Sequence, residues 1–474
     1  MFFESFVLNL AILIILIFAL LFDYVTKFFS YWYVRHIFYK RPLPFFGSDY
    51  HRVLGLRSNT DEVNQLYRKH PKEKFVGYIK SRIPDLIVKD SDAVKTILST
   101  QFENFSSRGL ALEKSQDVCL RNNLFYTEGE KWTLLRQDLE SLLKKLTWNF
   151  DDNNEYLSGI NGDINVQVWL SNILDGAFKD LLMDENANSK GRLLLTEIRS
   201  QLQSASLLNK IKSYLKTIFP SLYVLFGLFT LPGQPTSRTL EILENSKLIK
   251  EINKIPIIPV SGIKEKFNKK PKKNTDTEFA FTVLTMFINE GYLPCLNVLT
   301  ALFFELAKNP EIQHKARTCV QNCGQEDYLD KVIKEATRLY PPYSVLTRKC
   351  VKAYKFPEND LLIDKHVTVT VPVEAIQRDR SHYKQPEAFD PDRFSNDDHS
   401  TSFVYLPYGA GPKKCLGEEL SLQILRSVTR AVLRKFEIEL CARSPKRLSV
   451  RDHNFGRYIE SDVWLKFTTV KINS

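Results

Sequence analysis

The first stretch of the chain is almost entirely apolar. Phe6 to Phe22 runs FVLNLAILIILIFALLF, with Asn9 its polar exception, and about 20 apolar residues cross a bilayer as a helix. A cleaved signal peptide has a basic start and a small-residue cleavage site, but here Glu4 is the early charge. Lys27, Arg35, Lys40 and Arg41 follow, and basic residues mark the cytosolic side. We therefore expect an uncleaved transmembrane anchor at residues 1–26, with the bulk of the chain in the cytosol.

The pattern then changes to a basic, proline-containing segment at residues 27–47. Pro42 and Pro44 cannot continue a helix and favour an extended path, so this segment is predicted to be a stiff hinge. No long flexible linker and no internal repeat follows. Residues 48–474 are therefore predicted to form one domain.

Within this domain most apolar positions recur every three or four residues, which indicates helices. Such spacing predicts helices at Leu139 to Leu146, Leu193 to Ile218 and Leu416 to Phe436. Alternation typical of half-buried strands appears at Leu86 to Val88 and at Val367 to Val373. The fold class is therefore mainly α with a small β region. Phe219 to Pro232 is apolar and interrupted by Pro and Gly, so it belongs either to the core or to a membrane surface.

Composition narrows the classes of partner. The 474 residues are 43% hydrophobic and 26% charged, with a net charge of +11, which allows a folded core and suits an anionic membrane or an acidic protein. No nucleic-acid-binding motif is present, so we expect no nucleic acid partner. The basic run Ile263 to Thr277 is predicted to be a solvated loop. The 32 Phe and 20 Tyr indicate either a large aromatic core or a lipophilic pocket with membrane contact.

The seven cysteines do not suggest a disulfide framework. Their number is odd and their spacing irregular, which indicates a reducing compartment. Cys319 and Cys323 are four residues apart, but no second pair or nearby His completes a zinc site. We expect both to be ordinary thiols.

Cys415 differs because of its surroundings. It follows YGAGPKK and precedes a predicted helix. Unpaired N–H groups at a helix start favour a thiolate, which is the form that ligates metals, and glycines let a backbone pass close to a flat ligand. A buried cysteine at a helix start explains these residues equally well.

The segment around Cys415 resembles the cysteine-pocket signature of the cytochrome P450 family, F-x-x-G-x-R-x-C-x-G. Gly411, Cys415 and Gly417 match it, while Tyr408 replaces Phe and Lys413 replaces Arg. The resemblance covers nearly the whole chain, because the family's other motifs follow in order. It implies the cytochrome P450 fold, haem b (iron protoporphyrin IX) and Cys415 as the axial thiolate. Segments such as ENFSSRG and FDPDRF most resemble the insect detoxification branch.

Two further motifs resemble the family's ion cluster behind the haem. Glu335 and Arg338 match E-x-x-R, and Arg393 in PDRF matches P-E-R-F with Asp392 in place of Glu. Residues three apart share one helix face, and a buried guanidinium needs a carboxylate partner. We therefore expect a structural ion cluster of Glu335, Arg338 and Arg393.

Other matches imply residues that hold the haem. Trp132 and Arg136 match the family's W-x-x-x-R, and Arg348 aligns with another arginine that binds a haem propionate. Lys413 is expected to supply a third cation to these carboxylates, as a point charge rather than a fork. Tyr408, Gly411 and Gly417 complete the predicted cofactor-binding set.

The family's central helix carries A/G-G-x-D/E-T, whose acid and threonine relay protons to bound dioxygen. The corresponding residues here are Glu290, Gly291, Tyr292, Leu293 and Pro294. Leu293 and Pro294 cannot relay a proton, and Pro294 should distort the helix and leave the carbonyl of Glu290 free. Glu290 and Gly291 are the predicted catalytic residues. Glu290 is expected to be a covalent tether to the haem or a surrogate acid, unless it turns to solvent.

The resemblance implies a membrane-bound monooxygenase that inserts one oxygen atom from O2 into a lipophilic substrate such as a xenobiotic, fatty acid, steroid or terpenoid. Its electrons would come from NADPH through cytochrome P450 reductase, with cytochrome b5 as a further partner, at the endoplasmic reticulum membrane facing the cytosol. The docking face for the acidic flavoprotein would carry Lys131, Lys144, Lys145, Lys413 and Lys414. Two alternatives remain open at this stage: a haem-thiolate isomerase or dehydratase acting on hydroperoxides or oximes, which Leu293 and Pro294 favour, and a non-catalytic haem protein.

Overall fold

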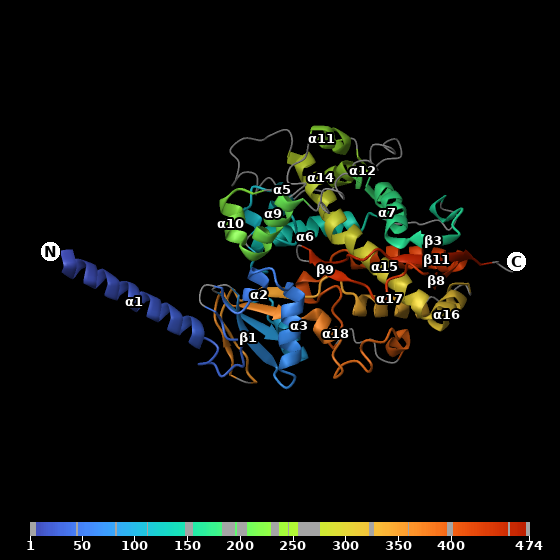
Figure 1. Cartoon of the computed structure of the whole chain (residues 1–474). Helices are drawn as coiled ribbons and strands as arrows, with labels where there is room; N and C mark the ends of the chain where they lie inside the picture. The colour runs from blue at the N-terminus through green and yellow to red at the C-terminus, as the bar shows by residue number, and fades with distance from the viewer. Residues whose placement is uncertain are drawn as a thin grey trace. The chain divides into compact units, whose positions relative to one another are not determined.

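The computed structural model divides into two compact units, Met1–Gly109 with Val345–Ala375, and Leu110–Ser344 with Ile376–Ser474. It describes residues 6–43, 46–80, 83–110, 112–146, 155–182, 195–196, 206–228, 237–244, 246–254, 275–321, 327–358, 360–395, 402–453 and 456–470. Figure 1 shows the elements of both units in chain colours.

The first unit is built on a four-stranded sheet in the order β1-β2-β7-β4. Its strands are β1 (Phe75–Lys80), β2 (Ile83–Val88), β7 (Thr368–Val371) and β4 (Leu346–Lys349). β2 pairs with β7 in parallel, and the other two pairs are antiparallel. A two-stranded ribbon, β5 (Tyr354–Lys355) and β6 (Leu362–Ile363), belongs to the same unit.

The helices of this unit are α1 (Phe6–Ser30), α2 (Tyr50–Val53), α3 (Asn59–Lys69), α4 (Ser91–Lys95) and a π-helical turn, η1 (Thr96–Thr100). In α1, the segment Leu8–Thr26 is long and apolar enough to cross a membrane, and none of it is buried inside the protein. Its exposed leucines, isoleucines and phenylalanines have no protein surface to pack against. A bilayer would cover them.

The predicted hinge after α1 is bonded to the sheet. Gly77 of β1 exchanges backbone hydrogen bonds with Phe38 and Lys40. Trp32 is 1% exposed, and its indole N–H donates to the carbonyl of Tyr78 at 2.9 Å. A Cβ on Gly77 would lie 2.5 Å from Cγ of Trp32, so only glycine leaves room for the indole. The chain that leaves the anchor is thereby part of the core of this unit.

The second unit is mainly helical. Its helices are α5 (Val118–Arg121), α6 (Gly129–Leu143), α7 (Val166–Leu182), α9 (Leu207–Ile218), α10 (Pro220–Leu225), α11 (Ser237–Glu244), α12 (Lys247–Lys254), α14 (Thr275–Met286), α15 (Leu293–Lys308), α16 (Pro310–Gln321), α17 (Asp327–Leu339) and α19 (Glu418–Lys435). Short turns are η2 (Leu112–Lys114), η3 (Glu155–Leu157), η5 (Phe287–Tyr292), η6 (Pro391–Phe394) and η7 (Gly411–Lys413). The helix α18 (Val373–Gln377) spans the boundary between the units.

Two small sheets complete this unit. One has the order β3-β11-β8, formed by β3 (Gly162–Asn165), β11 (Trp464–Thr469) and β8 (Phe436–Leu440). The other pairs β9 (Val450–His453) with β10 (Gly456–Ile459). All three pairings are antiparallel.

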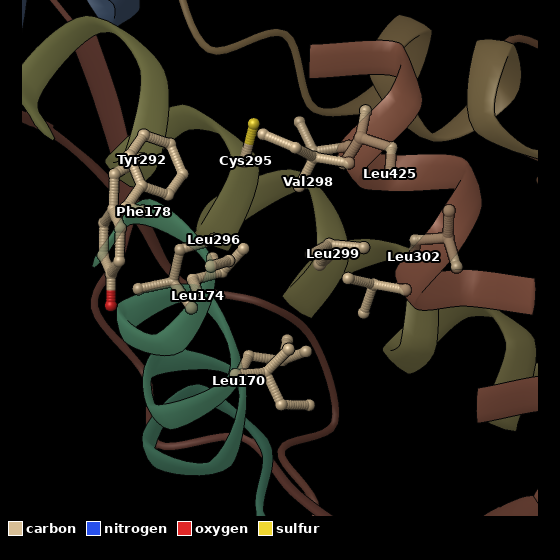
Figure 2. Close-up of a cluster of buried hydrophobic side chains, with 14 of the residues drawn as sticks. Leu170, Leu174, Phe178, Tyr292, Cys295, Leu296, Val298, Leu299, Leu302 and Leu425 are labelled. Atoms are coloured by element: carbon tan, nitrogen blue, oxygen red, sulfur yellow. The ribbon is translucent and has the colours of Figure 1, made fainter. Parts of the chain in front are cut away.

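The core of the second unit is centred on α15. Figure 2 shows its leucines and Val298 between Leu170, Leu174 and Phe178 of α7 on one side and Leu425 of α19 on the other. α15 is apolar on nearly every face, as expected for a helix with neighbours all round. The segment Phe279–Lys308 also has the length and hydropathy of a membrane span, but 67% of it is buried inside the protein. It is therefore a core helix.

These elements confirm the predicted class, mainly α with a small β region. β2 contains Leu86 to Val88, β7 lies within Val367 to Val373, and α19 lies within Leu416 to Phe436. The helix predicted at Leu139 to Leu146 ends earlier, because α6 runs from Gly129 to Leu143. Of Leu193 to Ile218, the structure describes α9, while residues 197–205 lie outside the described residues, as do Cys323, Pro44 and most of the basic run Ile263 to Thr277. The boundaries at residues 26 and 47 stay predictions.

Candidate functional site

Cys415 lies in a tight loop before α19. The turn η7 forms over Gly411–Lys413, and the N–H of Cys415 donates to the carbonyl of Tyr408 at 2.8 Å. Gly409 and Gly411 have φ values of 70° and 69°, which side chains with a Cβ rarely adopt. The thiol is exposed rather than packed in the core. The reading of Cys415 as a buried cysteine at a helix start is therefore wrong.

The helix does not start immediately after Cys415 as expected. α19 begins at Glu418, with Gly417 as its N-cap, so two residues separate the thiol from the helix. Gly417 has open space around the position of a Cβ. Its small size is therefore not required by the packing of the described protein atoms.

The cysteine loop is tied to α6, which carries two of the predicted cofactor residues. Arg136 donates from Nη1 to the carbonyl of Lys414 at 3.0 Å. Lys413 is buried, and its Nζ lies 4.4 Å from the ring centroid of Trp132. The structure thus brings Trp132, Arg136, Lys413 and Cys415 together, although they are 283 residues apart at the extremes of the sequence (415 − 132).

Tyr408 stands where the family has Phe, and its phenol is fixed. The hydroxyl accepts a hydrogen bond from Oγ of Ser421 on α19 at 3.1 Å. Burial raises the pKa of Tyr408 above its usual range, so the phenol is neutral. The ring keeps the apolar body of a phenylalanine while its hydroxyl anchors the loop to the helix.

Glu335, Arg338 and Arg393 lie together. The side chains of Glu335 and Arg338 are both 0% exposed. Arg338 donates to the carboxylate of Glu335 through Nε and Nη2, at 2.7 and 2.8 Å. Arg393 donates from Nε to the same carboxylate at 3.1 Å, and the N–H of Asp390 adds a fourth bond. The buried carboxylate of Glu335 is bonded by two guanidinium groups and a backbone N–H, which fits a structural rather than a catalytic role.

Arg348 lies on β4 in the other unit. It is 2% exposed, and its Nη1 donates to the carbonyl of Thr347. No carboxylate forms an ion pair with it in the described part of the chain, and its Nε has no hydrogen-bond partner there. Burial, and then the charge of Arg108, lower the pKa of Arg348 to about 9. A buried guanidinium without an acid is the environment in which an anionic group would be stabilised.

The predicted distortion of the central helix is present. Between α14 and α15, residues Phe287–Tyr292 form the π-helical turn η5, and Pro294 follows within the first turn of α15. Tyr292 on this turn stacks edge-on against Phe178, with ring centroids 5.3 Å apart, and its hydroxyl donates to the carbonyl of Ser171. Leu293 is buried in the core. A π-turn adds one residue to a helical turn, which accommodates a proline that cannot pair with the carbonyl four residues earlier.

Glu290 is on this π-turn and points into the protein, so the alternative of a solvent-facing side chain is not what the structure shows. Its Oε1 accepts from the amides of Asn289 at 3.0 Å and Asn123 at 3.3 Å, while Oε2 is enclosed without a hydrogen bond. Burial raises the pKa of Glu290 to about 7, against the opposing effects of the two amides and of Lys216. The carboxyl can therefore hold or release a proton near neutral pH.

Several polar residues around Glu290 were not predicted from the sequence. Asp117 precedes α5, Lys216 is on α9 and Tyr223 is on α10, and all three are buried. The Tyr223 hydroxyl donates to Oδ2 of Asp117 at 3.3 Å. No local motif marks them, because they come from three loops or helices that meet only in the folded chain.

These residues fit the cofactor that the motifs predict. A Cβ on Gly291 would make ordinary contact with the ring of Phe178 at 3.7 Å, and a Cβ on Gly417 would meet nothing. Neither glycine is demanded by protein packing, so both leave room for a flat group. Within the second unit, Arg136 and Lys413 supply cations suited to carboxylates, and Cys415 supplies an exposed thiol.

Comparisons with known proteins agree with the family that the motifs indicate. The sequence model of the family "Cytochrome P450" matches residues 197–462. Cytochrome P450 6B1 of Papilio polyxenes is 28% identical, over 91% of this chain and 94% of its own length. Cytochrome P450 6k1 of Blattella germanica is 26% identical, over 92% of each chain. The similarity to these insect proteins confirms the predicted insect branch. The chain belongs to the cytochrome P450 family and is a monooxygenase with haem b and a cysteine thiolate as cofactor and ligand.

Proposed function

We propose that this protein is a membrane-bound monooxygenase that inserts one oxygen atom into a lipophilic substrate, with electrons from NADPH delivered by a reductase. The observation that carries the proposal is the cysteine loop held against α6. Arg136 bonds the carbonyl of the residue before Cys415, and Lys413 lies over Trp132. An exposed thiol is thus presented beside two cations on a fixed backbone.

The haem supplies the activation of dioxygen, and its thiolate ligand favours O–O cleavage. The side chains present have separate tasks. Cys415 is the proposed ligand to the iron. Arg136, Lys413 and Arg348 are proposed to bind the propionates, with the indole of Trp132 beside Lys413. Gly291 and Gly417 leave space for the faces of the ring.

Glu290 is the proposed proton donor in place of the family's acid and threonine. Its pKa of about 7 puts it near the optimum for a general acid at neutral pH. Asn123 and Asn289 donate to Oε1, so rotation of the carboxyl is restrained and its proton is placed on Oε2. A covalent ester between Glu290 and the haem stays a prediction; acid–solvent extraction that leaves haem on the protein is the expected result if the ester forms.

The proposed reductase surface differs from the predicted set of lysines. Lys144, Lys145 and Lys414 are exposed and can meet an acidic flavoprotein. Lys413 is 5% exposed, so its inclusion in a docking surface is wrong. Lys131 donates to the carbonyl of Arg121 and to the side chain of Asn122, which ties it to its own fold. Cytochrome b5 is a further proposed partner on the same charge argument.

The proposed membrane is the endoplasmic reticulum, with the catalytic part in the cytosol. α1 provides the anchor. A second apolar surface lies on α9 and α10, where six large side chains are at least 40% exposed: Leu207, Leu208, Ile211, Leu222, Leu225 and Phe226. This α9–α10 apolar surface supports the membrane reading of Phe219 to Pro232 for its described part, because Leu222, Leu225 and Phe226 face outward.

The test uses the purified full chain with a reductase and NADPH, compared with Cys415→Ser. We expect NADPH-dependent oxygen insertion into a lipophilic substrate, and loss of the thiolate-type absorption spectrum in the variant. Tyr408→Phe, which restores the family's residue, is the matched control and should keep the spectrum. A Cys415→Ser protein with an unchanged spectrum contradicts the assignment of the ligand.

Leu293 and Pro294 favour one alternative, a haem-thiolate isomerase or dehydratase that needs no dioxygen. Both residues stand where a proton relay would be, and neither side chain exchanges protons. The same preparation with a lipid hydroperoxide and no reductant separates the two functions. Consumption of the hydroperoxide without any NADPH-dependent oxygen insertion supports the alternative and contradicts the proposed function.

A further inference from the structure

The helix α9 has its polar and apolar residues on unexpected sides. Leu207 and Leu208 are 75% and 61% exposed, whereas the one fully buried residue of this helix is Lys216, at 4% exposed. Lysine is almost never buried without a partner, because its ammonium loses its hydration. Something other than the folding of α9 must therefore account for an ammonium in the interior.

The interior around Lys216 holds opposite charges, but none close enough to pair with it. No hydrogen bond and no ion pair within 4.0 Å is made by Lys216 to the residues that the structure describes. Burial lowers the pKa of Lys216 to about 8, and the charges of Asp117, Glu290 and Cys119 oppose that effect. Asp117 is occupied elsewhere, because it accepts from the hydroxyl of Tyr223 and from the N–H of Cys119. Among the residues that the structure describes, no acceptor is bonded to the ammonium.

The same interior reaches the cysteine loop. The charge of Glu290 raises the pKa of both Lys216 and the phenol of Tyr343. The charge of Cys415 also raises the pKa of Tyr343. The ring of Tyr343 stacks on Phe125, with centroids 5.8 Å apart. Asn123, which donates to Glu290, also accepts from the N–H of Phe125, so neighbouring contacts of one interior join the π-turn to Tyr343.

We infer that Lys216 binds a neutral acceptor oxygen, a hydroxyl or carbonyl group, at the polar end of the lipophilic substrate. This inference rests on the proposed function. The charge balance selects a neutral oxygen over a carboxylate: Lys216 and Asp117 already cancel, and an ionised Glu290 makes the cluster negative, so a further anion would be repelled. A hydrogen bond from an ammonium to a neutral oxygen adds no charge and gives the ammonium an acceptor.

The experiment measures binding to the haem-loaded full chain by calorimetry, without reductase or NADPH. The probes share one hydrocarbon skeleton: 1-adamantanol, adamantane (by competition) and adamantane-1-carboxylate. Lys216→Met keeps the length of the side chain and removes the ammonium. The matched control is Lys210→Met, because Lys210 is an exposed lysine on the same helix.

We expect Lys216→Met to weaken binding of 1-adamantanol about 10-fold or more, the loss of one charged hydrogen bond, and to change binding of adamantane less than about 2-fold. Lys210→Met should change neither. If Lys216→Met does not retain haem, Lys216→Gln replaces it, and a weaker loss in the same direction is expected because its amide is an uncharged donor.

The inference is overturned if Lys216→Met weakens binding of 1-adamantanol and adamantane equally. It is also overturned if the wild-type protein does not bind 1-adamantanol, or if only binding of adamantane-1-carboxylate depends on Lys216. These results leave the proposed function untouched, since that is judged by the thiolate spectrum and by NADPH-dependent turnover. Conversely, a failure of turnover does not alter the calorimetric comparison of the alcohol with the hydrocarbon.

Discussion

At the scale of single residues, Glu290 shows how environment rather than residue type sets chemistry. It replaces a small residue of the family motif, and its carboxyl group is enclosed by Asn123, Asn289 and apolar neighbours. In water a glutamate would be ionised at neutral pH. Here burial raises its pKa to about 7, so the same side chain becomes an acid that still carries a proton for part of the time.

The titration of Glu290 can be observed directly. We expect an infrared band of a protonated carboxyl group that disappears with a midpoint near pH 7 and is absent in Glu290→Gln. Because the folded-state pKa is raised, the protonated group stabilises the fold below its unfolded pKa, and this contribution is lost as pH rises from about 4.5 to about 7. Relative to Glu290→Gln, the loss should be about 3 kcal/mol. A band that titrates below pH 5 would exclude Glu290 as the proton donor at neutral pH.

The ion cluster permits a second test at this scale. Glu335→Gln keeps the shape of the side chain but leaves the fully buried Arg338 without its counter-charge. Breaking such a pair should lower the free energy of unfolding by about 3–5 kcal/mol, measured by thermal or denaturant unfolding. Lys315→Ala is the control, because Lys315 pairs with Asp392 at the surface, where the side chains are 53% and 55% exposed, and should cost less than about 1 kcal/mol. Equal effects would show that the cluster is not structural.

At the scale of elements, the π-turn η5 and Pro294 explain each other. The backbone of Tyr292 and Leu293 is helical on both sides of the junction, so Pro294 lies inside a continuous helix, where it lacks an N–H and crowds the preceding turn. The extra residue of the π-turn gives that ring space. It also turns Glu290 toward Asn123, so a backbone irregularity positions the candidate acid.

Proline has opposite consequences in two neighbouring helices. Pro294→Ala restores an N–H inside a helix and should stabilise the protein, on the order of 1–3 kcal/mol. Pro310→Ala changes the first residue of α16, where proline is favoured, and should destabilise slightly, by about 0.5 kcal/mol. Thermal unfolding of the two variants tests this contrast in sign. If both variants are destabilised alike, Pro294 is not a strained helix residue.

At the scale of the whole molecule, the anchor is joined to a folded unit without a free linker. Trp32 lies against Gly77, and Tyr31 and Arg35 both bond the carboxylate of Asp364. The last residues after α1 are therefore structural. The charge pattern predicts where the anchor ends, but it could not show that the following chain is part of the sheet unit.

This arrangement fixes where the anchor can be removed. A chain without residues 1–29 keeps Trp32 and should fold, whereas Trp32→Ala in the same chain should lower the free energy of unfolding by about 3–5 kcal/mol. Tyr33→Ala is the matched control, since Tyr33 is 70% exposed, and should stay within about 0.5 kcal/mol. The shortened chain should still bind lipid vesicles through the α9–α10 apolar surface, and Leu225→Asp should weaken that binding. Identical stability of the Trp32 and Tyr33 variants would contradict the packing of Trp32.

The sequence alone determined those features that depend on neighbours in the chain. Helical and alternating apolar spacing located α19, β2 and β7, and the apolar helix α1 followed from one long apolar run. The motif residues Glu335, Arg338 and Cys415 were found because each motif has a fixed local spacing. Such spacing also gave the position of Pro294, and hence the distortion around it, because the missing N–H of proline is a property of the residue itself.

Tertiary structure decided which distant residues meet. Asp117, Lys216, Tyr223 and Glu290 share one buried site, and no periodicity relates a loop, two helices and a π-turn. It also decided burial: Lys413, which was expected on the docking face as well as near the haem, is buried over Trp132, while Cys415, for which a buried cysteine was the alternative to an iron ligand, is exposed. Burial and charge proximity depend on contacts between segments far apart in the chain, and together they set the proton affinities of Glu290 and Lys216.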